Sequence, residues 1–159
     1  LFPYTTLFRS LDAELINELL EDGRASLRSV GESLDVSVTT VSNHLRELEA
    51  AGTIKGFVPV IDYDTLGYDV TAIVQLKVEG ASLPDITARL DDMDRMFTVY
   101  EVTGEFDIIA VGKFEDTDAM NDVIKELQAL EEIKESNTSV VLDAPVECDQ
   151  FPLPIEDGE

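Results

Sequence analysis

The sequence is poor in basic residues, in cysteine and in tryptophan. Among its 159 residues, 34 are Asp or Glu and 11 are Lys or Arg, so the formal net charge is −23. The single cysteine, Cys148, excludes an internal disulfide and favours a reducing compartment, the cytoplasm. No apolar run approaches the roughly 20 residues of a transmembrane helix, which argues against a membrane protein. Hydrophobic residues still make up 44% of the chain, enough for the cores of one or two small domains.

The acids are distributed along the whole chain instead of lying in one tail. Apolar residues recur periodically between them, a pattern that a disordered acidic chain lacks. We therefore expect the acids to cover a folded surface, and such a surface stays soluble where salt screens its self-repulsion. This predicts a salt-loving source, with an ordinary acidic protein as the alternative.

Residues 1–10, LFPYTTLFRS, differ from the rest of the chain because they contain no acid. They have neither the apolar core nor the cleavage site of a secretory signal. The string is similar to the translation of a common sequencing-adapter oligonucleotide. We therefore expect a cloning or sequencing scar here, with a native N-terminal arm as the alternative.

Residues 11–61 have the pattern of a small helical domain. Apolar stripes with helical spacing predict three helices, at residues 11–20, 27–34 and 38–48. Ser26 and Ser37 stand where N-caps are needed, and Gly52 is expected to end the third helix. A short turn followed by a Ser-capped helix predicts a helix-turn-helix.

The outward face of the third predicted helix carries small polar side chains and one Arg. At about 100° per residue, the residues opposite the apolar stripe are Thr39, Thr40, Asn43, Arg46 and Glu47, with Ser42 and His44 on the flanks. Short side chains let a helix enter the major groove, where Asn43 can pair with adenine and Arg46 with guanine. Ser37 and the first backbone N–H groups can hold a phosphate. Further phosphate contacts are expected from Arg24, Arg28 and Lys55. The alternative is an ordinary solvated helix face.

The apolar residues around Gly56 and Pro59 predict a short hairpin over residues 53–61, the wing of a winged helix-turn-helix. The sequence DYDTLG at 62–67 is then expected to be a linker. Residues 144–159 form an acidic, Pro-rich tail that we expect to be disordered and solvated.

Residues 68–143 predict a second domain of the α+β class. Alternating and helical patterns follow one another in the order β-α-β-β-α-β, with segments at 68–80, 82–93, 96–102, 106–114, 116–130 and 136–143. Ser82 is the expected cap of the first helix, and TGE at 103–105 the expected tight turn between the middle strands. This order is that of a ferredoxin-like fold, a four-stranded antiparallel sheet with two helices on one face.

The predicted sheet has a second apolar face. Ile73, Ile109 and Val111 lie out of phase with the residues that face the helices. An apolar face of this kind is usually covered by another subunit, so we expect a homodimer formed through the sheets.

Residues 11–143 as a whole resemble the Lrp/AsnC family, the leucine-responsive and asparagine-responsive transcription regulators. The resemblance lies in LDAELINELLEDGRASLRSVGESLDVSVTTVSNHLRELEAAGTIKGF and in VTGEFDIIAVGKF, with TSVVL closing the second domain. It implies a regulator that binds double-stranded DNA as a dimer, with tetramers and octamers as larger assemblies. It also implies an amino acid or related small molecule as effector, and, with the acidity, a halophilic archaeon as source.

Carried over by position, the effector hairpin of the family corresponds to Thr103, Gly104, Glu105, Phe106 and Asp107, with Thr138 in the last strand. Backbone N–H groups near Gly104 can bind a carboxylate, and Asp107 can bind an α-amino group. The alternative is a plain hairpin whose Gly permits the turn.

One departure concerns the recognition helix, which in the family usually carries several basic residues. Residues 11–60 hold 9 acids and 4 bases, so hydrogen bonds and shape must contribute more than counterion release.

Two other classes of function compete with a DNA-binding regulator. An enzyme is disfavoured because neither Cys148 nor His44 has a catalytic companion at useful spacing. The sequence also lacks CxxC, HExxH and a glycine-rich phosphate loop, so no metal or cofactor is expected. The remaining alternative is a ligand-binding or oligomerisation module without sequence-specific DNA binding.

Overall fold

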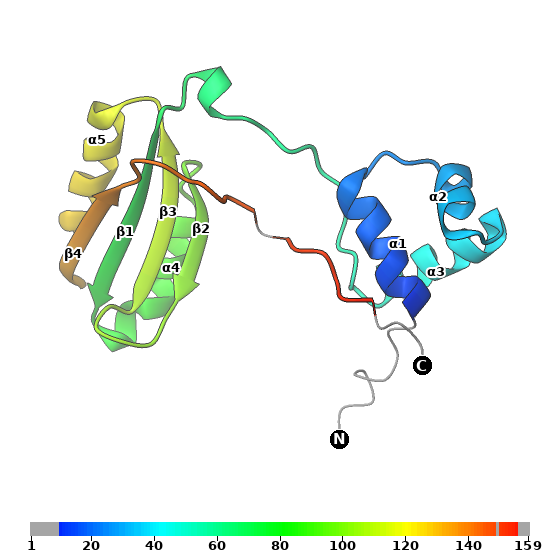
Figure 1. Cartoon of the computed structure of the whole chain (residues 1–159). Helices are drawn as coiled ribbons and strands as arrows, with labels where there is room; N and C mark the ends of the chain where they lie inside the picture. The colour runs from blue at the N-terminus through cyan, green and yellow to red at the C-terminus, as the bar shows by residue number, and fades with distance from the viewer. Residues whose placement is uncertain (1–9, 149, 156–159) are drawn as a thin grey trace. The chain divides into compact units, whose positions relative to one another are not determined.

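The structure is a computed structural model that describes residues 10–148 and 150–155. Contacts divide the chain into two compact units (Figure 1). One comprises Leu1–Pro59 together with Val146–Glu159, and the other comprises Val60–Pro145. None of the helices in the described part of the chain has the length and apolarity needed to cross a bilayer.

The first unit contains three helices, α1 (Ser10–Glu21), α2 (Leu27–Leu34) and α3 (Val38–Ala50), as the apolar stripes predicted. Their shared core consists of Leu15, Val30, Val41 and Leu48. The predicted caps are confirmed, because the Ser26 hydroxyl accepts from Ser29 N–H and the Ser37 hydroxyl from Thr40 N–H. Residues 1–9 of the expected scar lie outside the described residues, and Ser10 already belongs to α1.

The turn between α2 and α3 is tight. Asp35 adopts the left-handed conformation, with φ 54°, that Asp tolerates better than most residues. The Val36 N–H donates to the Gly31 carbonyl over 2.9 Å. A side chain at Gly31 would place its Cβ 2.8 Å from the Val36 carbonyl oxygen, so the backbone approach here requires glycine.

The predicted hairpin over residues 53–61 is wrong for the described chain. No strand is assigned between Thr53 and Ile61, and after the last helical turn the backbone runs without a ladder partner. The N–H groups of Thr53 and Ile54 both donate to the Leu48 carbonyl, which ends α3 instead of starting a strand. Beyond this point Val58 and Val60 are 84% and 100% exposed. A strand needs a second strand to bond, and this segment has none among the described residues.

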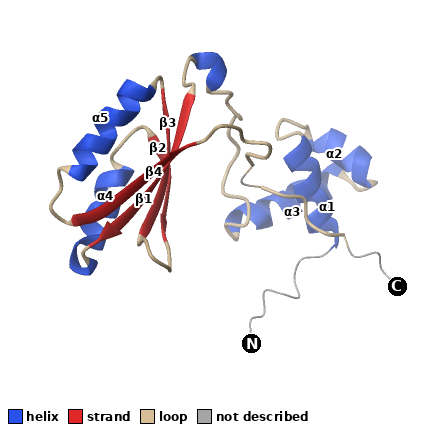
Figure 2. Ribbon diagram, turned by 60° about the vertical axis from the view of Figure 1, so that its left-hand side comes forward, coloured by secondary structure: helices blue, strands red, loops and turns tan. Residues whose placement is uncertain are grey.

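The second unit has the predicted β-α-β-β-α-β order. Its elements are β1 (Val70–Val78), α4 (Leu83–Asp91), β2 (Met96–Glu101), β3 (Ile108–Phe114), α5 (Thr117–Gln128) and β4 (Ile133–Val140). The strands form one antiparallel sheet in the order β2-β3-β1-β4. Figure 2 shows α4 and α5 on the same side of this sheet, so the α+β, ferredoxin-like prediction is confirmed.

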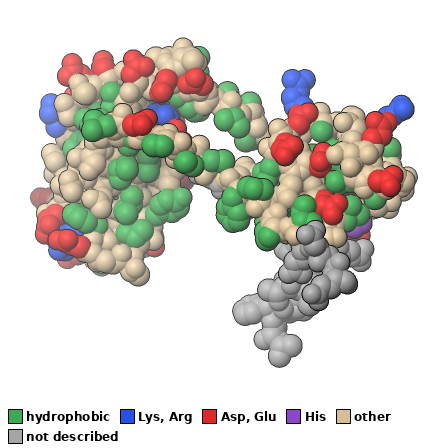
Figure 3. Space-filling view, viewed as in Figure 1, with side chains coloured by type: hydrophobic (Ala, Val, Ile, Leu, Met, Phe, Trp, Pro, Cys, Tyr) green, Lys and Arg blue, Asp and Glu red, His purple; other side chains and the backbone are tan. Residues whose placement is uncertain are grey.

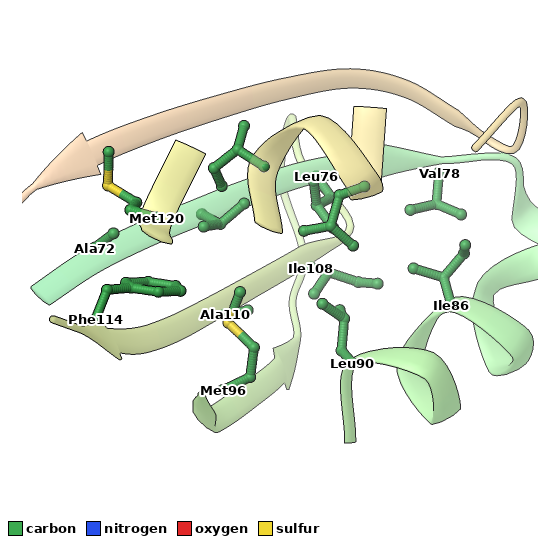
Figure 4. Close-up of a cluster of buried hydrophobic side chains, with 13 residues drawn as sticks. Ala72, Leu76, Val78, Ile86, Leu90, Met96, Ile108, Ala110, Phe114 and Met120 are labelled. Atoms are coloured by element: carbon green, nitrogen blue, oxygen red, sulfur yellow. The ribbon is translucent and has the colours of Figure 1, made fainter. Parts of the chain in front are cut away.

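The core of the second unit lies between the sheet and the two helices (Figure 4). Alternate residues of β1 and β3 point into it and are fully buried, among them Leu76, Ile108 and Phe114. Leu90 of α4 and Met120 of α5 close the core from the helix side. Burying side chains of this size contributes about 1.5–3 kcal/mol each.

Two local predictions need correction. Ser82 makes no side-chain cap, because it ends a short 3-10 turn, Gly80–Ser82, immediately before α4. The last strand begins at Ile133 and ends at Val140, earlier than predicted at both ends. Its bounds are set by its hydrogen-bonded pairing with β1, which runs from Ile133 opposite Val78 to Val140 opposite Ala72 and includes polar residues. The segment at 62–67 contains a 3-10 turn, Asp64–Leu66, whose start is capped by the Asp62 carboxylate.

The tail is also partly ordered, contrary to the expectation of a disordered tail. Leu153 is half-buried and forms two hydrogen bonds with Asn17 of α1. Sequence composition favoured disorder here because the tail is acidic and rich in proline. A contact between residues 136 positions apart is not encoded in local composition.

The face of the sheet away from the helices carries the predicted second apolar set. Ile73 lies opposite Val111, and Ile109 lies opposite Tyr100. Tyr100 is 57% exposed, and Phe97, the extra residue of a bulge in β2, is 55% exposed. Figure 3 shows hydrophobic side chains gathered on this side of the unit.

Candidate nucleic-acid interface and effector hairpin

The outward face of α3 presents the residues expected to read bases. Thr39, Asn43 and Arg46 are exposed, as is Glu47, while Thr40 and Ser42 are half-buried. Within the described residues, the side chains of Asn43 and Arg46 make no hydrogen bond or ion pair. Their donors and acceptors are therefore available to a partner outside the chain.

The N-terminus of α3 forms a compact polar cap. The Ser37 hydroxyl accepts from Thr40 N–H over 3.1 Å and lies 2.8 Å from the Thr40 hydroxyl. Both hydroxyls are thus engaged in holding the helix start. Next to them is a shallow, open depression lined by Arg28, Glu32 and Val38, among others. Unpaired N–H groups in the first turn of a helix favour an anion at such a place.

The candidate phosphate-binding cations are exposed, and Figure 3 shows Lys and Arg side chains of this unit close to Asp and Glu side chains. Arg28 pairs with Glu32 one helical turn away, with Nε and Oε1 3.1 Å apart and the side chains 83% and 69% exposed. An exposed pair of this kind is worth about 0.5 kcal/mol or less, so a phosphate can replace the carboxylate. The side chains of Arg24 and Lys55 are exposed without an ion pair in the described chain.

His44 occupies a different environment from the rest of the candidate reading residues. Its Nδ1 lies 2.6 Å from Asp12 Oδ1, and the two side chains are only 12% and 13% exposed. The pair joins α3 to α1 across the core of the unit. This geometry favours a role in holding the recognition helix, and a DNA contact by His44 stays a prediction.

Asp12 is a residue that the sequence reasoning missed. A signal was present, because Asp12 precedes Leu15, Ile16 and Leu19 by three, four and seven positions. That spacing places a carboxylate on the apolar face of α1. An acid on such a face is expected to have a partner, and here the partner is the single histidine.

The expected effector hairpin is a four-residue loop between β2 and β3. The Val102 N–H donates to the Asp107 carbonyl over 2.9 Å and closes the loop. Gly104 has φ 120°, a conformation that residues with a Cβ rarely adopt, so glycine is required for this turn. Thr103, Gly104 and Glu105 are exposed, and Phe106 is half-buried.

The Asp107 carboxylate is anchored to the sheet. Its Oδ2 accepts from Val78 N–H over 2.8 Å, and its own N–H donates to the Leu76 carbonyl over 2.9 Å. Oδ1 accepts no hydrogen bond from the described residues. One carboxylate oxygen therefore holds the end of β1.

Thr138 does not join the hairpin within one chain. It pairs with Val74 on β1, and Val74 is fully buried on the helix-covered side of the sheet. Thr138 therefore points to that side, on the edge strand β4. The hairpin joins β2 to β3, so β1 lies between β4 and the two strands that the hairpin connects.

No group of three or more His, Cys, Asp or Glu side chains with metal-binding geometry occurs in the part of the chain that the structure describes.

Comparison with protein families matches both units. Residues 9–55 match a model for a winged helix-turn-helix DNA-binding domain, and residues 71–151 match a model for the Lrp/AsnC ligand-binding domain. The second match covers the hairpin and the first half of the tail, and the first covers all three helices.

Individual relatives give the same picture. An uncharacterised HTH-type transcriptional regulator of Pyrococcus abyssi is 37% identical over 133 residues, which is 84% of this chain and 90% of that one. The solved structure of E. coli AsnC superposes with a TM-score of 0.83 at 26% identity, over 89% of this chain and 97% of that one. A transcriptional regulator of Neisseria meningitidis, solved as a complex with L-Met, superposes with a TM-score of 0.86 at 19% identity, over 94% and 97%.

Proposed function

Because this chain belongs to the Lrp/AsnC family of DNA-binding transcriptional regulators, which are not enzymes, we propose that it reads a two-fold symmetric DNA site as a homodimer. We further propose that its DNA binding responds to an amino acid. The observation that carries DNA reading is the outward face of α3. Asn43 and Arg46 stand exposed one turn apart, with their polar groups unused by the described chain. Amide and guanidinium groups are the side chains that pair bidentately with adenine and guanine.

Phosphate contacts position the helix in the groove. The first turn of α3 supplies backbone N–H groups beside Ser37, and Arg28, Arg24 and Lys55 supply exposed cations. The Arg28–Glu32 pair is weak enough to exchange for Arg28–phosphate. The acids around these cations repel DNA at low salt, so we propose binding in a molar-salt cytoplasm, where the acids are screened.

The effector site that we propose is the hairpin Thr103–Asp107. Exposed backbone N–H groups around Gly104 suit a carboxylate, and Asp107 Oδ1 suits an α-amino group. These are the two groups that every free amino acid presents. The Neisseria meningitidis regulator of the same fold was solved with L-Met bound, which supports this chemical class. Thr138 then contributes from another protomer, since it does not reach the hairpin of its own chain.

The dimer that we propose covers the open face of the sheet. Ile73, Ile109 and Val111 form its centre, with Tyr100 and Phe97 toward the β2 edge. Tetramers and octamers are the larger assemblies that the family allows.

The experiment is a selection of genomic DNA fragments. The full chain is incubated with sheared archaeal DNA in molar KCl, with and without a pool of amino acids, and the retained DNA is sequenced. We expect a short two-fold symmetric site whose enrichment changes with the pool. Asn43→Ala and Arg46→Ala are each expected to weaken binding to that site by about 1–3 kcal/mol.

The matched controls are Asn121→Ala and Arg89→Ala, which make the same chemical changes on exposed positions of the other unit. Equal binding by the α3 variants and the controls would remove the reading role of Asn43 and Arg46. Absence of any enriched site would favour the competing function, a ligand-binding module without sequence-specific DNA binding.

A further inference from the structure

The C-terminal segment Phe151–Ile155, with the sequence FPLPI, is predisposed to stay extended. Proline fixes its own φ and also keeps the preceding residue out of the helical region. Phe151 and Leu153 each precede a proline, so both are restricted before any contact forms. The structure accordingly has neither helix nor strand over 151–155. Little entropy remains to be lost when such a segment docks on a partner.

Among the three central residues of this segment, Pro152, Leu153 and Pro154, only Leu153 has a backbone N–H that can donate a hydrogen bond. Pro152 and Pro154 have no N–H, so a partner that recognises the backbone here must contact the Leu153 N–H. Asn17 does so with both ends of its side-chain amide. The Leu153 N–H donates to Asn17 Oδ1 over 2.7 Å, and Asn17 Nδ2 donates to the Leu153 carbonyl over 2.9 Å.

This contact is specific in position. Asn17 and Leu153 are both half-buried, whereas Phe151 and Ile155 on either side are 73% and 47% exposed. The tail therefore does not adhere to α1 through its largest apolar side chains. A planar amide that satisfies the N–H and C=O of one residue resembles the pairing that a neighbouring strand would offer.

We propose that Phe151–Ile155 is an intramolecular ligand of the helix-turn-helix unit, which docks on α1 at Asn17 and joins that unit to the ligand-binding domain by a second connection. The first connection is the chain at Pro59–Val60, and the second leaves β4 at Val140 and reaches α1 at Leu153. A second connection restricts the rotation of the helix-turn-helix unit, because the loop that it closes removes orientations open to a singly tethered unit. It also links β4 to α1 without the 53–61 segment, through the chain from Val140 to Leu153 and the two hydrogen bonds between Leu153 and Asn17.

The first test follows hydrogen exchange at the Leu153 amide by NMR, in the full chain labelled on leucine. We expect this amide to be protected in the parent chain and to exchange roughly tenfold faster in Asn17→Ala, since two hydrogen bonds are lost. Asn121→Ala, the same change on an exposed position of α5, is expected to leave the rate unchanged. Exchange of Leu153 at the rate of a free peptide in the parent chain would overturn the docking.

The second test measures transverse relaxation of backbone amides in the two units. Release of the tail is expected to lower the relaxation rates of α1–α3 amides, as that unit reorients more independently, and to leave those of the ligand-binding domain unchanged. Leu153→Pro removes the N–H donor together with the half-buried leucine side chain and keeps the segment extended, so it makes the same test without touching a helix. Unchanged relaxation despite loss of Leu153 protection would overturn the second connection. Neither readout involves DNA, so a failure here and a failure of DNA reading are told apart.

Discussion

The pair between His44 and Asp12 allows a quantitative test of how the recognition helix is held. His44 lies on α3 and Asp12 on α1, their nitrogen and oxygen are 2.6 Å apart, and both side chains are nearly nine-tenths buried. Removing either one leaves a poorly solvated polar group behind. The perturbation is Asp12→Ala, His44→Ala and the double substitution, each in the full chain.

The expected magnitudes follow from burial and charge. In Asp12→Ala the imidazole loses its acceptor, which costs about 1–3 kcal/mol for a buried unsatisfied group. The loss of an acid from the first turn of α1 adds about 0.3–1 kcal/mol. In His44→Ala the carboxylate stays behind, and breaking a fully buried pair costs about 3–5 kcal/mol. Because 13% of the Asp12 side chain remains exposed, we expect a value at or below the lower end of that range.

The assay is native-state hydrogen exchange at the Leu15 and Leu48 amides, which report the unfolding free energy of the helix-turn-helix core. A double-mutant cycle is expected to give a coupling of about 1.5–3 kcal/mol, typical of a hydrogen bond to a charged group. The control is Glu14→Ala, which removes a neighbouring acid of α1 that has no ion pair in the described chain. Its unfolding free energy is expected to lie within about 0.5 kcal/mol of that of the parent chain. A coupling below about 0.5 kcal/mol would refute the argument that this pair holds α3 on α1.

Two further predictions concern the same unit. Glu32→Gln removes the carboxylate that competes for Arg28, so DNA affinity in filter binding is expected to rise by up to about twofold. Glu131→Gln in the other unit is expected to leave the affinity unchanged, and equal effects of both would mean that net charge alone acts. Gly31→Ala places a Cβ 2.8 Å from the Val36 carbonyl oxygen and is expected to destabilise the unit by about 1–3 kcal/mol in the same exchange measurement. Gly56→Ala, where no atom lies within 4 Å of the added Cβ, is expected to be neutral or slightly stabilising because it reduces unfolded-state entropy; a neutral Gly31→Ala would contradict the close approach at the turn.

Most of the fold could be predicted from local sequence patterns. Apolar residues at helical spacing indicate α1, α2 and α3, and strict alternation indicates β1, because the backbone periods of 3.6 and 2 decide which side chains share a face. Ser26 and Ser37 mark helix starts because their hydroxyls satisfy N–H groups only three residues away. Gly104 marks a turn because few other residues adopt its φ.

The candidate site divides in the same way. The exposed face of α3 with Asn43 and Arg46 follows from helical period alone, and the structure presents both side chains as predicted. The role of His44 could not be read from its position on α3. Its partner Asp12 lies 32 residues earlier in the chain, and only the packing of α1 against α3 brings the two together.

The sequence by itself therefore determined the three helices of the first unit and the β-α-β-β-α-β order of the second, which faces are apolar, and which polar residues face outward on α3. Each of these depends on interactions within a few residues. The tertiary structure alone decided that 53–61 has no strand partner in the part of the chain that the structure describes, that Asp107 commits one oxygen to Val78, and that Leu153 returns to Asn17. These outcomes depend on contacts between distant segments, whose formation is set by the packing of the whole chain and not by local composition.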